Sequence, residues 1–258
     1  MTSPKTILIT GASGGLGSAL ALGYAAPGVK LILIGRNNDK LNEIANLCIA
    51  QGAEVEGVSL DVRGKIEMSE FIAKLCNQES IDIAIACAGV SAGTLRGPES
   101  PSQVEIIFDT NINGVLNTIM PIIPHMIAKK LGTIVIVSSM ASFTGLSSAP
   151  SYSATKACVR LFGEALRGYL QQYNVKTIVV IPGYIKTNMT QVNNFPMPFM
   201  VSAEKAAQKI IRGIESNKGI IAFPLIMYVF VKILTLLPNR LISYINSKIP
   251  GKPAFERE

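Results

Sequence analysis

The chain has 258 residues, of which 48% are hydrophobic and 16% are charged, and its formal net charge is +7. This composition excludes a disordered chain and is sufficient for one large α/β domain with a sizeable core. The basic residues are spread along the sequence, so we expect a solvated basic surface, or attraction to an anionic cofactor or membrane, rather than a nucleic-acid site.

Histidine and cysteine usage predicts neither a metal site nor a disulfide framework. The single histidine, His125, has no ligand cluster around it, so we expect a helix-surface or boundary residue; a Ser-His-Asp hydrolase would have to use it. The cysteines are scattered without a CxxC pair, and we interpret them as reduced core thiols: Cys48, Cys76, Cys87 and Cys158. No basic region and cleavage site precede the first apolar run, so we expect a cytoplasmic protein.

Short apolar runs in regular alternation with helical patterns predict the fold class. The predicted strands span 6–10, 30–35, 53–60, 81–89, 132–139, 175–183 and 219–224. Their continuous hydrophobicity is typical of strands buried on both faces. The predicted helices span 15–26, 39–50, 65–78, 102–130, 151–173 and 202–216. This order predicts a Rossmann-type, doubly wound, seven-stranded parallel sheet with helices on both faces, formed by one domain over residues 1–223.

The first predicted strand ends in a glycine-rich turn, TGASGGLGSAL. Gly11, Gly15 and Gly17 have GxxxGxG spacing between a strand and a helix. Glycine lets the backbone approach a ligand closely, and the N-terminus of the following helix attracts phosphate. The spacing is neither a Walker A loop nor GxGxxG. Its place on the first strand favours a dinucleotide site over a ligand-free structural turn.

Further motifs follow in order along the chain. They are an Asp after the third strand, Ala-Gly at 88–89, an Asn in the long helix, a Ser after the fifth strand, YxxxK at 152–156 and PGxIxT at 182–187. Each alone is weak, but together with the glycine turn they resemble the single-domain form of the short-chain dehydrogenase/reductase family over about residues 5–223. The resemblance implies an NAD(P)-dependent oxidoreductase with its cofactor along the carboxyl ends of the strands.

The resemblance also implies which residues contact the cofactor. They are Gly11, Ser13, Gly15, Leu16, Gly17, Arg36, Asp61, Val62, Ala88, Gly89, Tyr152, Lys156, Pro182, Ile185 and Thr187. Asp61 would accept a hydrogen bond from the adenine amino group, with Val62 against the ring; a helix cap is the alternative for Asp61. Ile185 and Thr187 would hold the nicotinamide carboxamide. Cys87 stands where the family usually has Asn, and a thiol cannot replace the hydrogen bonds of an amide.

The end of the second strand favours NADP(H) over NAD(H). An NAD-specific site would place Asp or Glu there, whereas this chain has Gly35, then Arg36, with Lys40 one turn later. A guanidinium suits a 2′-phosphate. Gly14 occupies the place where many NADP-binding relatives carry a second basic residue. The alternative for Arg36 is an ordinary surface arginine.

The resemblance assigns catalysis to Asn111, Ser139, Tyr152 and Lys156. Tyrosine titrates near pH 10, so we expect Lys156 and an oxidised nicotinamide to lower the pKa of Tyr152 by about 2–3 units. Tyr152 would donate a proton to a carbonyl oxygen while hydride reaches the carbon. Ser139 would steady that oxygen, and Asn111 would hold a water linked to Lys156. Strand alternation directs Ser138 elsewhere, and the NxxG pattern selects Asn111 over Asn113.

The loop over 188–201 carries apolar side chains: Phe195, Met197, Phe199 and Met200. In the family this region covers the substrate, which favours an apolar ketone or secondary alcohol. Packing without ligand contact is the alternative.

Residues 224–258 form a predicted C-terminal extension. The apolar run 220–237 contains Pro224 and Lys232, and leaves about 13 residues of helix, too few for a span of about 20. We expect this helical tail to pack on its own domain or a partner subunit, or to lie on a membrane surface with Lys232, Arg240 and Lys248 near the headgroups. The family resemblance implies a homodimer or homotetramer through the helices at 102–130 and 151–173.

Two other functions remain as alternatives. One is a non-catalytic NADP(H)-binding sensor or scaffold, which the intact set of four catalytic residues disfavours. The other is an epimerase or dehydratase, which usually needs a larger C-terminal substrate region than this tail provides.

Overall fold

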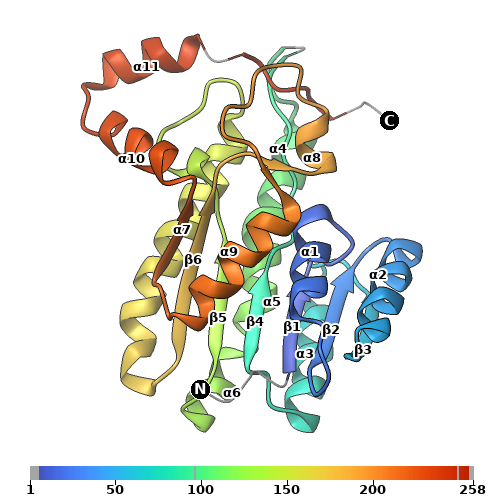
Figure 1. Cartoon of the computed structure of the whole chain (residues 1–258). Coiled ribbons are helices and arrows are strands. Elements are labelled where there is room, and N and C mark those ends of the chain that lie inside the picture. Colours follow the sequence, from blue (N-terminus) through green and yellow to red (C-terminus); the bar gives the residue numbers. More distant parts are fainter. Residues whose placement is uncertain (1–5, 96, 249, 256–258) are drawn as a thin grey trace.

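A central parallel sheet organises the chain. The computed structural model describes residues 6–95, 97–248 and 250–255. The strands are β1 (Thr6–Thr10), β2 (Lys30–Gly35), β3 (Glu54–Ser59), β4 (Ile83–Ala86), β5 (Thr133–Val137), β6 (Lys176–Pro182) and β9 (Ile220–Phe223), in the order β3-β2-β1-β4-β5-β6-β9. Every neighbouring pair is parallel. The predicted seven-stranded, doubly wound sheet is therefore confirmed (Figure 1).

Helices cover both faces of the sheet. These helices are α1 (Gly15–Tyr24), α2 (Asn38–Ala50), α3 (Lys65–Gln78), α4 (Pro101–Phe108), α5 (Gly114–Ile119), α6 (Ile123–Lys129), α7 (Pro150–Leu170) and α9 (Ala203–Glu215). Alternate strand residues point to opposite faces, so Ile7 and Ile9 pack with α1, α2 and α9, whereas Leu8 packs with α3, α5 and α7. Both faces of the central strands are buried, which explains their continuous hydrophobicity.

Strand β3 differs from this pattern because it lies at the edge of the sheet. Its residues are exposed or half-buried, with three glutamate or glycine positions open to solvent. The prediction that this run is buried on both faces is wrong. As the edge strand, β3 pairs with β2 alone, and α2 packs against β3.

The predicted helix over 102–130 is interrupted. A π-helical turn (Asp109–Asn113) separates α4 from α5, and a short gap separates α5 from α6. One extra residue in a helical turn changes which side chains face the sheet, and such turns are frequent at functional sites. By length and composition alone, the stretch 101–129 could cross a membrane, but half of its apolar window is buried inside the domain, as in a core helix.

The carboxyl ends of all seven strands meet at one edge of the sheet. Strand β1 lies between β2 and β4, and from β1 the chain builds the sheet outward in opposite directions, through β2 and β3 on one side and through β4 and β5 on the other. Open parallel sheets bind ligands at such a reversal. A small second sheet, β7 (Ile185–Lys186) with β8 (Val201–Ser202), and helix α8 (Asn188–Gln191) lie above the same edge (Figure 1).

The C-terminal extension forms two helices, α10 (Leu225–Leu234) and α11 (Asn239–Ser247), instead of one. Pro238 stands at the break, and proline cannot continue a helix without losing a backbone hydrogen bond. The inner side of α10 packs on the domain through Met227, Tyr228 and Val231. Its outer side is exposed, so the chain's own domain covers this apolar helix on one side only, and cover by a partner subunit or a membrane stays a prediction.

Candidate active site

The glycine turn after β1 is packed too tightly for side chains. A Cβ on Gly17 would lie 2.2 Å from the Gly11 carbonyl oxygen, and one on Gly11 would lie 2.8 Å from Cα of Ala88. Gly11 also has a left-handed φ of 70°. Helix α1 begins after Gly14, and no side chain caps it. Its first N–H groups therefore remain available to a phosphate.

The ends of β2 and β3 bring three charged groups together. The Asp61 carboxylate accepts hydrogen bonds from the Arg63 guanidinium at 2.7 and 2.9 Å and from the Arg63 backbone N–H at 3.0 Å. Arg36 lies at the same place, with Nη1 3.9 Å from Asp61 Oδ2. Burial favours a higher pKa for Asp61, but the hydrogen bonds from Arg63 outweigh it and lower this pKa. Asp61 is therefore ionised at neutral pH.

Neighbouring predicted contacts adjust this picture. Asp61 is not a helix cap, because Gly64 occupies the cap position of α3. Val62 is 6% exposed and packs against Gly114, so little of its side chain is left for an adenine ring. A Cβ on Gly35 would lie 2.7 Å from the Ser13 hydroxyl oxygen. Because Gly35 has no side chain, the glycine turn fits beside Arg36.

The strand end at Cys87 is held by Thr10. The Thr10 hydroxyl accepts hydrogen bonds from the backbone N–H groups of Cys87 and Ala88, at 3.2 and 3.4 Å. This contact joins β1 to the turn after β4 without the amide that the family usually carries at position 87. Burial raises the pKa of the Cys87 thiol to about 12, although Lys156 opposes the shift, so the thiol is neutral.

Tyr152 and Ser139 are hydrogen-bonded to each other. Tyr152 lies in the first turn of α7, and Ser139 follows β5, where its hydroxyl also accepts from the Ala141 N–H at 3.1 Å. Burial raises the pKa of the Tyr152 phenol, the hydrogen bond with Ser139 lowers it, and Tyr184 raises it, so the net pKa lies above its ordinary value. Ser138 points elsewhere: its hydroxyl donates to the Lys156 carbonyl at 2.8 Å.

Lys156 lies one helical turn after Tyr152 and is 5% exposed. Its Nζ atom donates to the Val137 carbonyl at 3.0 Å and lies 5.9 Å from the centroid of the Tyr152 ring. Burial lowers the pKa of Lys156 to about 8, while the Cys87 thiol opposes this. In the cofactor-free chain, burial of the phenol dominates the pKa of Tyr152. The lowering of this pKa by Lys156 together with an oxidised nicotinamide stays a prediction.

Asn111 lies in the π-helical turn and is fully buried. Its Oδ1 atom accepts a hydrogen bond from the Val90 N–H at 2.9 Å. Its Nδ2 group donates to the Val90 carbonyl at 3.0 Å and to the Thr155 hydroxyl at 3.1 Å. A Cβ on Gly89 would lie 3.1 Å from Asn111 Oδ1 and 3.3 Å from Lys156 Nζ. The extra residue of the π turn thus brings Asn111 against the loop after β4 and beside Lys156.

The remaining predicted contacts come from the end of β6. Pro182 ends β6, and Ile185 is buried in β7. Thr187 touches the glycine turn, since a Cβ on Gly15 would lie 2.8 Å from Thr187 Cγ2. In the covering loop, the Phe195 ring meets the Tyr184 ring edge-on at 6.3 Å, whereas Phe199 and Met200 are exposed.

The residues fit a dinucleotide. The glycine turn leaves backbone exposed at Gly14 and Gly15, uncapped N–H groups suit a diphosphate, and the buried Lys156 ammonium bonds a carbonyl rather than a carboxylate. Sequence reasoning missed Thr10, whose role depends on a contact between strand ends, and Arg63, which bonds Asp61 two residues before it. It also missed Lys252, which reaches Tyr152 from the C-terminal segment and gives no local signal.

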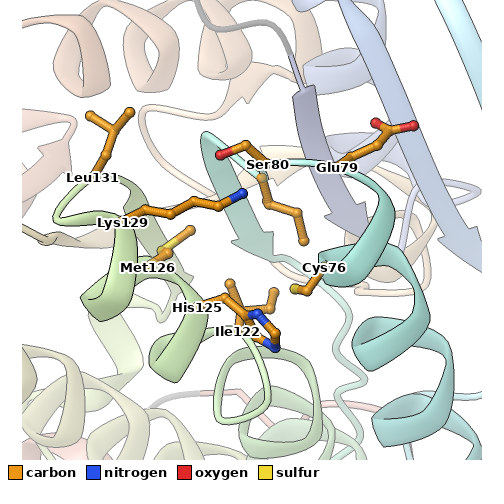
Figure 2. Close-up of a pocket in the computed structure, with 9 residues that line it drawn as sticks. Cys76, Glu79, Ser80, Ile122, His125, Met126, Lys129 and Leu131 are labelled. Carbon is orange, nitrogen blue, oxygen red and sulfur yellow. The ribbon is translucent and has the colours of Figure 1, made fainter.

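His125 lies far from these residues, half-buried on α6 at the opposite edge of the sheet. It lines a pocket of about 10 Å³, roughly one water molecule, with Cys76 and Met126 (Figure 2). In the described part of the chain no three His, Cys, Asp or Glu side chains form a metal cluster. Cys158 is exposed on α7, so the interpretation of every cysteine as a core thiol is wrong at that position.

Comparisons with known proteins agree with the fold and the motifs. Residues 5–196 match the family model described as short chain dehydrogenase. A protein from Myxococcus xanthus, named an uncharacterized oxidoreductase, is 37% identical over 93% of this chain and 95% of its own length. A short chain dehydrogenase/reductase from Burkholderia phymatum in complex with NAD superposes with a TM-score of 0.82, at 21% identity, over 99% of this chain and 100% of the other. A short-chain dehydrogenase from Sphingobium yanoikuyae in complex with NADPH gives 0.79, at 21% identity, over 98% and 99%.

Proposed function

The chain belongs to the short-chain dehydrogenase family, and from that membership we propose that it is an NADP(H)-dependent carbonyl reductase. The observation that carries the proposal is the hydrogen-bonded pair Ser139–Tyr152, with the buried Lys156 ammonium one turn away. We further propose that residues 1–223 form the catalytic domain and that residues 224–258 extend it.

Arg36 supports NADP(H) as the cofactor. Its guanidinium is 59% exposed and lies 3.9 Å from Asp61, beyond hydrogen-bond distance, so it remains available to a 2′-phosphate. Asp61 is engaged mainly by Arg63, and position 35 carries no carboxylate for a ribose hydroxyl. The two related structures contain NADPH and NAD respectively, which supports a nicotinamide dinucleotide in either form.

The bound nicotinamide supplies hydride to the carbonyl carbon, and the chain's own residues manage the oxygen. The Ser139 hydroxyl donates to the substrate oxygen and holds it beside the phenol. Tyr152 then donates its proton to that oxygen. Lys156 binds the nicotinamide ribose, and Asn111 holds the loop after β4 that carries Gly89 beside the same ribose.

The raised pKa of Tyr152 means that the phenol is protonated at neutral pH in the cofactor-free chain. Burial keeps the phenol protonated, which is the form that a proton donor needs. Oxidation would require the phenolate, and nothing in the cofactor-free site lowers the pKa of Tyr152 below its ordinary value. A cationic nicotinamide would supply that effect in the reverse reaction.

The test is a screen of ketones, aldehydes and secondary alcohols with NADPH and NADH, followed by nicotinamide absorbance. We expect ketone-dependent NADPH oxidation, which the variant Tyr152→Phe loses while it still binds NADPH. A wild-type protein that binds NADPH and turns over no carbonyl compound would instead support a non-catalytic sensor. The apolar side chains of the covering loop favour ketones with a hydrocarbon body.

Two exposed apolar surfaces support assembly. Phe108, Met120 and Leu161 are exposed on the helices at 101–129 and α7, and we propose that they lie in the interface of a homo-oligomer. The exposed apolar side chains of α10 and α11 form a second surface in the same tail as Arg240 and Lys248, and we propose that it contacts an anionic membrane. Lys232 is not part of it, because its ammonium stacks on the rings of Phe143 and Tyr228.

A further inference from the structure

The C-terminal segment returns to the active site. After α11, residues 250–255 run beside the loop that follows β4. The Gly93 N–H donates to the Pro253 carbonyl at 2.8 Å, the Leu95 N–H donates to the Lys252 carbonyl at 2.9 Å, and the Phe255 N–H donates to Gln103 Oε1 at 3.1 Å. These bonds join the segment to the domain between β4 and α4, next to the predicted nicotinamide end of the site.

A glycine makes room for this segment. A Cβ on Gly93 would lie 2.3 Å from the Ser148 carbonyl oxygen and 2.6 Å from Cβ of Lys252. Asn246 at the end of α11 is buried, and its amide donates to the Gly145 carbonyl at 2.7 Å. Its own carbonyl accepts from the Ser147 hydroxyl at 2.6 Å. The tail is therefore anchored on the loop before α7 and on the loop after β4.

The side chain of Lys252 extends from this segment to Tyr152. Its Nζ atom lies 5.8 Å from the centroid of the Tyr152 ring and donates to the Ser91 hydroxyl at 2.8 Å. It also lies 3.5 Å from the Met189 carbonyl, on helix α8 of the covering loop. Lys252 thus contacts three walls around the phenol: the loop after β4, α7 and α8.

The ammonium of Lys252 lacks a counter-charge in the part of the chain that the structure describes, where no carboxylate lies within 4.0 Å of it. It has three N–H donors, and its two neighbours are a hydroxyl and a distant carbonyl. Lys252 is half-buried, and an ammonium partly removed from water with neutral partners gains from an anionic acceptor. Burial lowers the pKa of Lys252 to about 8, so it is cationic at neutral pH.

We propose that Lys252 is a substrate-binding residue that selects ketones bearing a carboxylate close to the reacting carbonyl. This inference rests on the proposed function. The carbonyl oxygen of such a 2-oxo acid accepts the Tyr152 proton, while its carboxylate accepts from the Lys252 ammonium. Hydride from the nicotinamide and the phenol proton together give the 2-hydroxy acid. The hydrocarbon remainder of the substrate lies against the apolar covering loop.

The test compares two probes of one shape, benzoylformate and its methyl ester, with NADPH. We expect Lys252→Met to raise KM for benzoylformate at least tenfold and to change KM for the ester less than twofold. Lys252→Arg keeps the charge and should keep the preference for the acid. Lys209→Met, an exposed lysine on α9, should behave as wild type with both probes.

Equal changes for acid and ester in Lys252→Met would overturn the inference and show that Lys252 only anchors the tail. Wild-type reduction of the ester but not of the acid would also overturn it, while leaving carbonyl reductase activity intact. If neither probe is reduced, binding decides: in the presence of NADPH, benzoate should raise the melting temperature of wild type more than benzamide does. Loss of that difference in Lys252→Met supports the inference, and its absence from wild type refutes it.

Discussion

The Nζ atom of Lys156 bonds the Val137 carbonyl, 3.0 Å away, rather than the phenol of Tyr152, whose ring centroid is 5.9 Å away. Val137 is the last residue of β5, and Ser139, the hydrogen-bond partner of Tyr152, follows two positions later. One strand end therefore holds both the cation and the phenol of α7. The Lys156 ammonium is directed to the backbone in the cofactor-free chain and has donors left for a ribose.

Removing the phenol should separate catalysis from binding. Tyr152→Phe keeps the ring but has no proton to donate, so we expect kcat for ketone reduction to fall by about 10²–10⁴-fold. NADPH affinity, measured by nicotinamide fluorescence, should change little. Ser139→Ala removes the hydroxyl that contacts the substrate oxygen, so it should lower kcat by up to about 10³-fold. A Tyr152→Phe variant with wild-type kcat would show that another group donates the proton.

The buried Lys156 should give the cofactor-free protein a distinct pH dependence of stability. The folded-state pKa is about 8 and the ordinary value is 10.5. Between these values the unfolded chain binds more protons, so the free energy of unfolding gains a contribution that rises with pH. Below the folded pKa both states are protonated, and the full cost of burying the ammonium is present.

Denaturant unfolding at pH values between about 8 and 10 measures this effect. Lys156→Met should show a smaller rise in unfolding free energy across this range than wild type, whatever other groups contribute to the slope. Cys87 and Tyr152 face Lys156, and they are present in both proteins. The exposed Lys209→Met serves as the control and should keep the wild-type slope. Identical slopes for wild type and Lys156→Met would contradict the lowered pKa.

Arg36 should decide between the two nicotinamide dinucleotides. Loss of a charge-assisted hydrogen bond to a 2′-phosphate costs about 1.5–3 kcal/mol, so Arg36→Ala should raise KM for NADPH by about tenfold or more. KM for NADH should stay nearly constant, because NADH has no phosphate there. Lys74→Ala, on the exposed side of α3, is the control. Equal losses with both cofactors would mean that Arg36 is a surface arginine whose removal affects the strand end only.

How much of this site could be predicted depended on whether a residue's role is local. The glycine turn, YxxxK and the strand ends are local patterns, and the seven-stranded sheet followed from their alternation. Thr10 bonds groups at the end of the neighbouring strand, so its role depends on the strand order, which a local pattern does not give. Arg63 bonds Asp61 two residues before it, so its spacing was a local signal. The pKa of Tyr152 in the cofactor-free chain depends on burial by several segments, which no local pattern gives.

The tail shows the same limit. Its apolar composition predicted a helix, but Pro238 divides it into two, and the return of residues 250–255 depends on the gap at Gly93. Lys252 lies 100 residues after Tyr152 in the sequence, and a proline and a glycine directly precede it. No periodicity or spacing brings such a residue to the phenol. Only the three-dimensional contacts of the tail do so.

The glycine turn should tolerate no side chain, in contrast with a glycine elsewhere in the same fold. A Cβ on Gly17 would meet the Gly11 carbonyl at 2.2 Å, so Gly17→Ala should lower the free energy of unfolding by at least about 1–3 kcal/mol and abolish NADPH binding. Gly168 is exposed on α7 with nothing near its Cβ position, so Gly168→Ala should stabilise the protein by about 0.5–1 kcal/mol. Denaturant unfolding and NADPH titration measure both effects. Unchanged NADPH binding by Gly17→Ala would place the cofactor elsewhere.

The exposed face of α10 should bind anionic membranes. Ile226, Phe230 and Ile233 recur at helical spacing and are 62%, 58% and 54% exposed. A continuous apolar stripe of this kind is rare on a monomer surface without a partner. We expect the protein to sediment with vesicles of phosphatidylcholine and phosphatidylglycerol, and less with phosphatidylcholine alone, because the same tail carries the exposed Arg240 and Lys248.

Phe230→Asp should abolish vesicle binding and leave NADPH oxidation intact, since α10 lies outside the catalytic residues. Ile49→Asp, at an exposed position of α2, should keep vesicle binding and serves as the matched control. Light scattering after size-exclusion chromatography distinguishes the competing partner. If wild type ignores both kinds of vesicle and Phe230→Asp converts an oligomer to a monomer, the face binds a second copy of the chain instead. In that case the apolar stripe is covered by protein, and the basic residues of the same tail need an acidic surface on the other subunit.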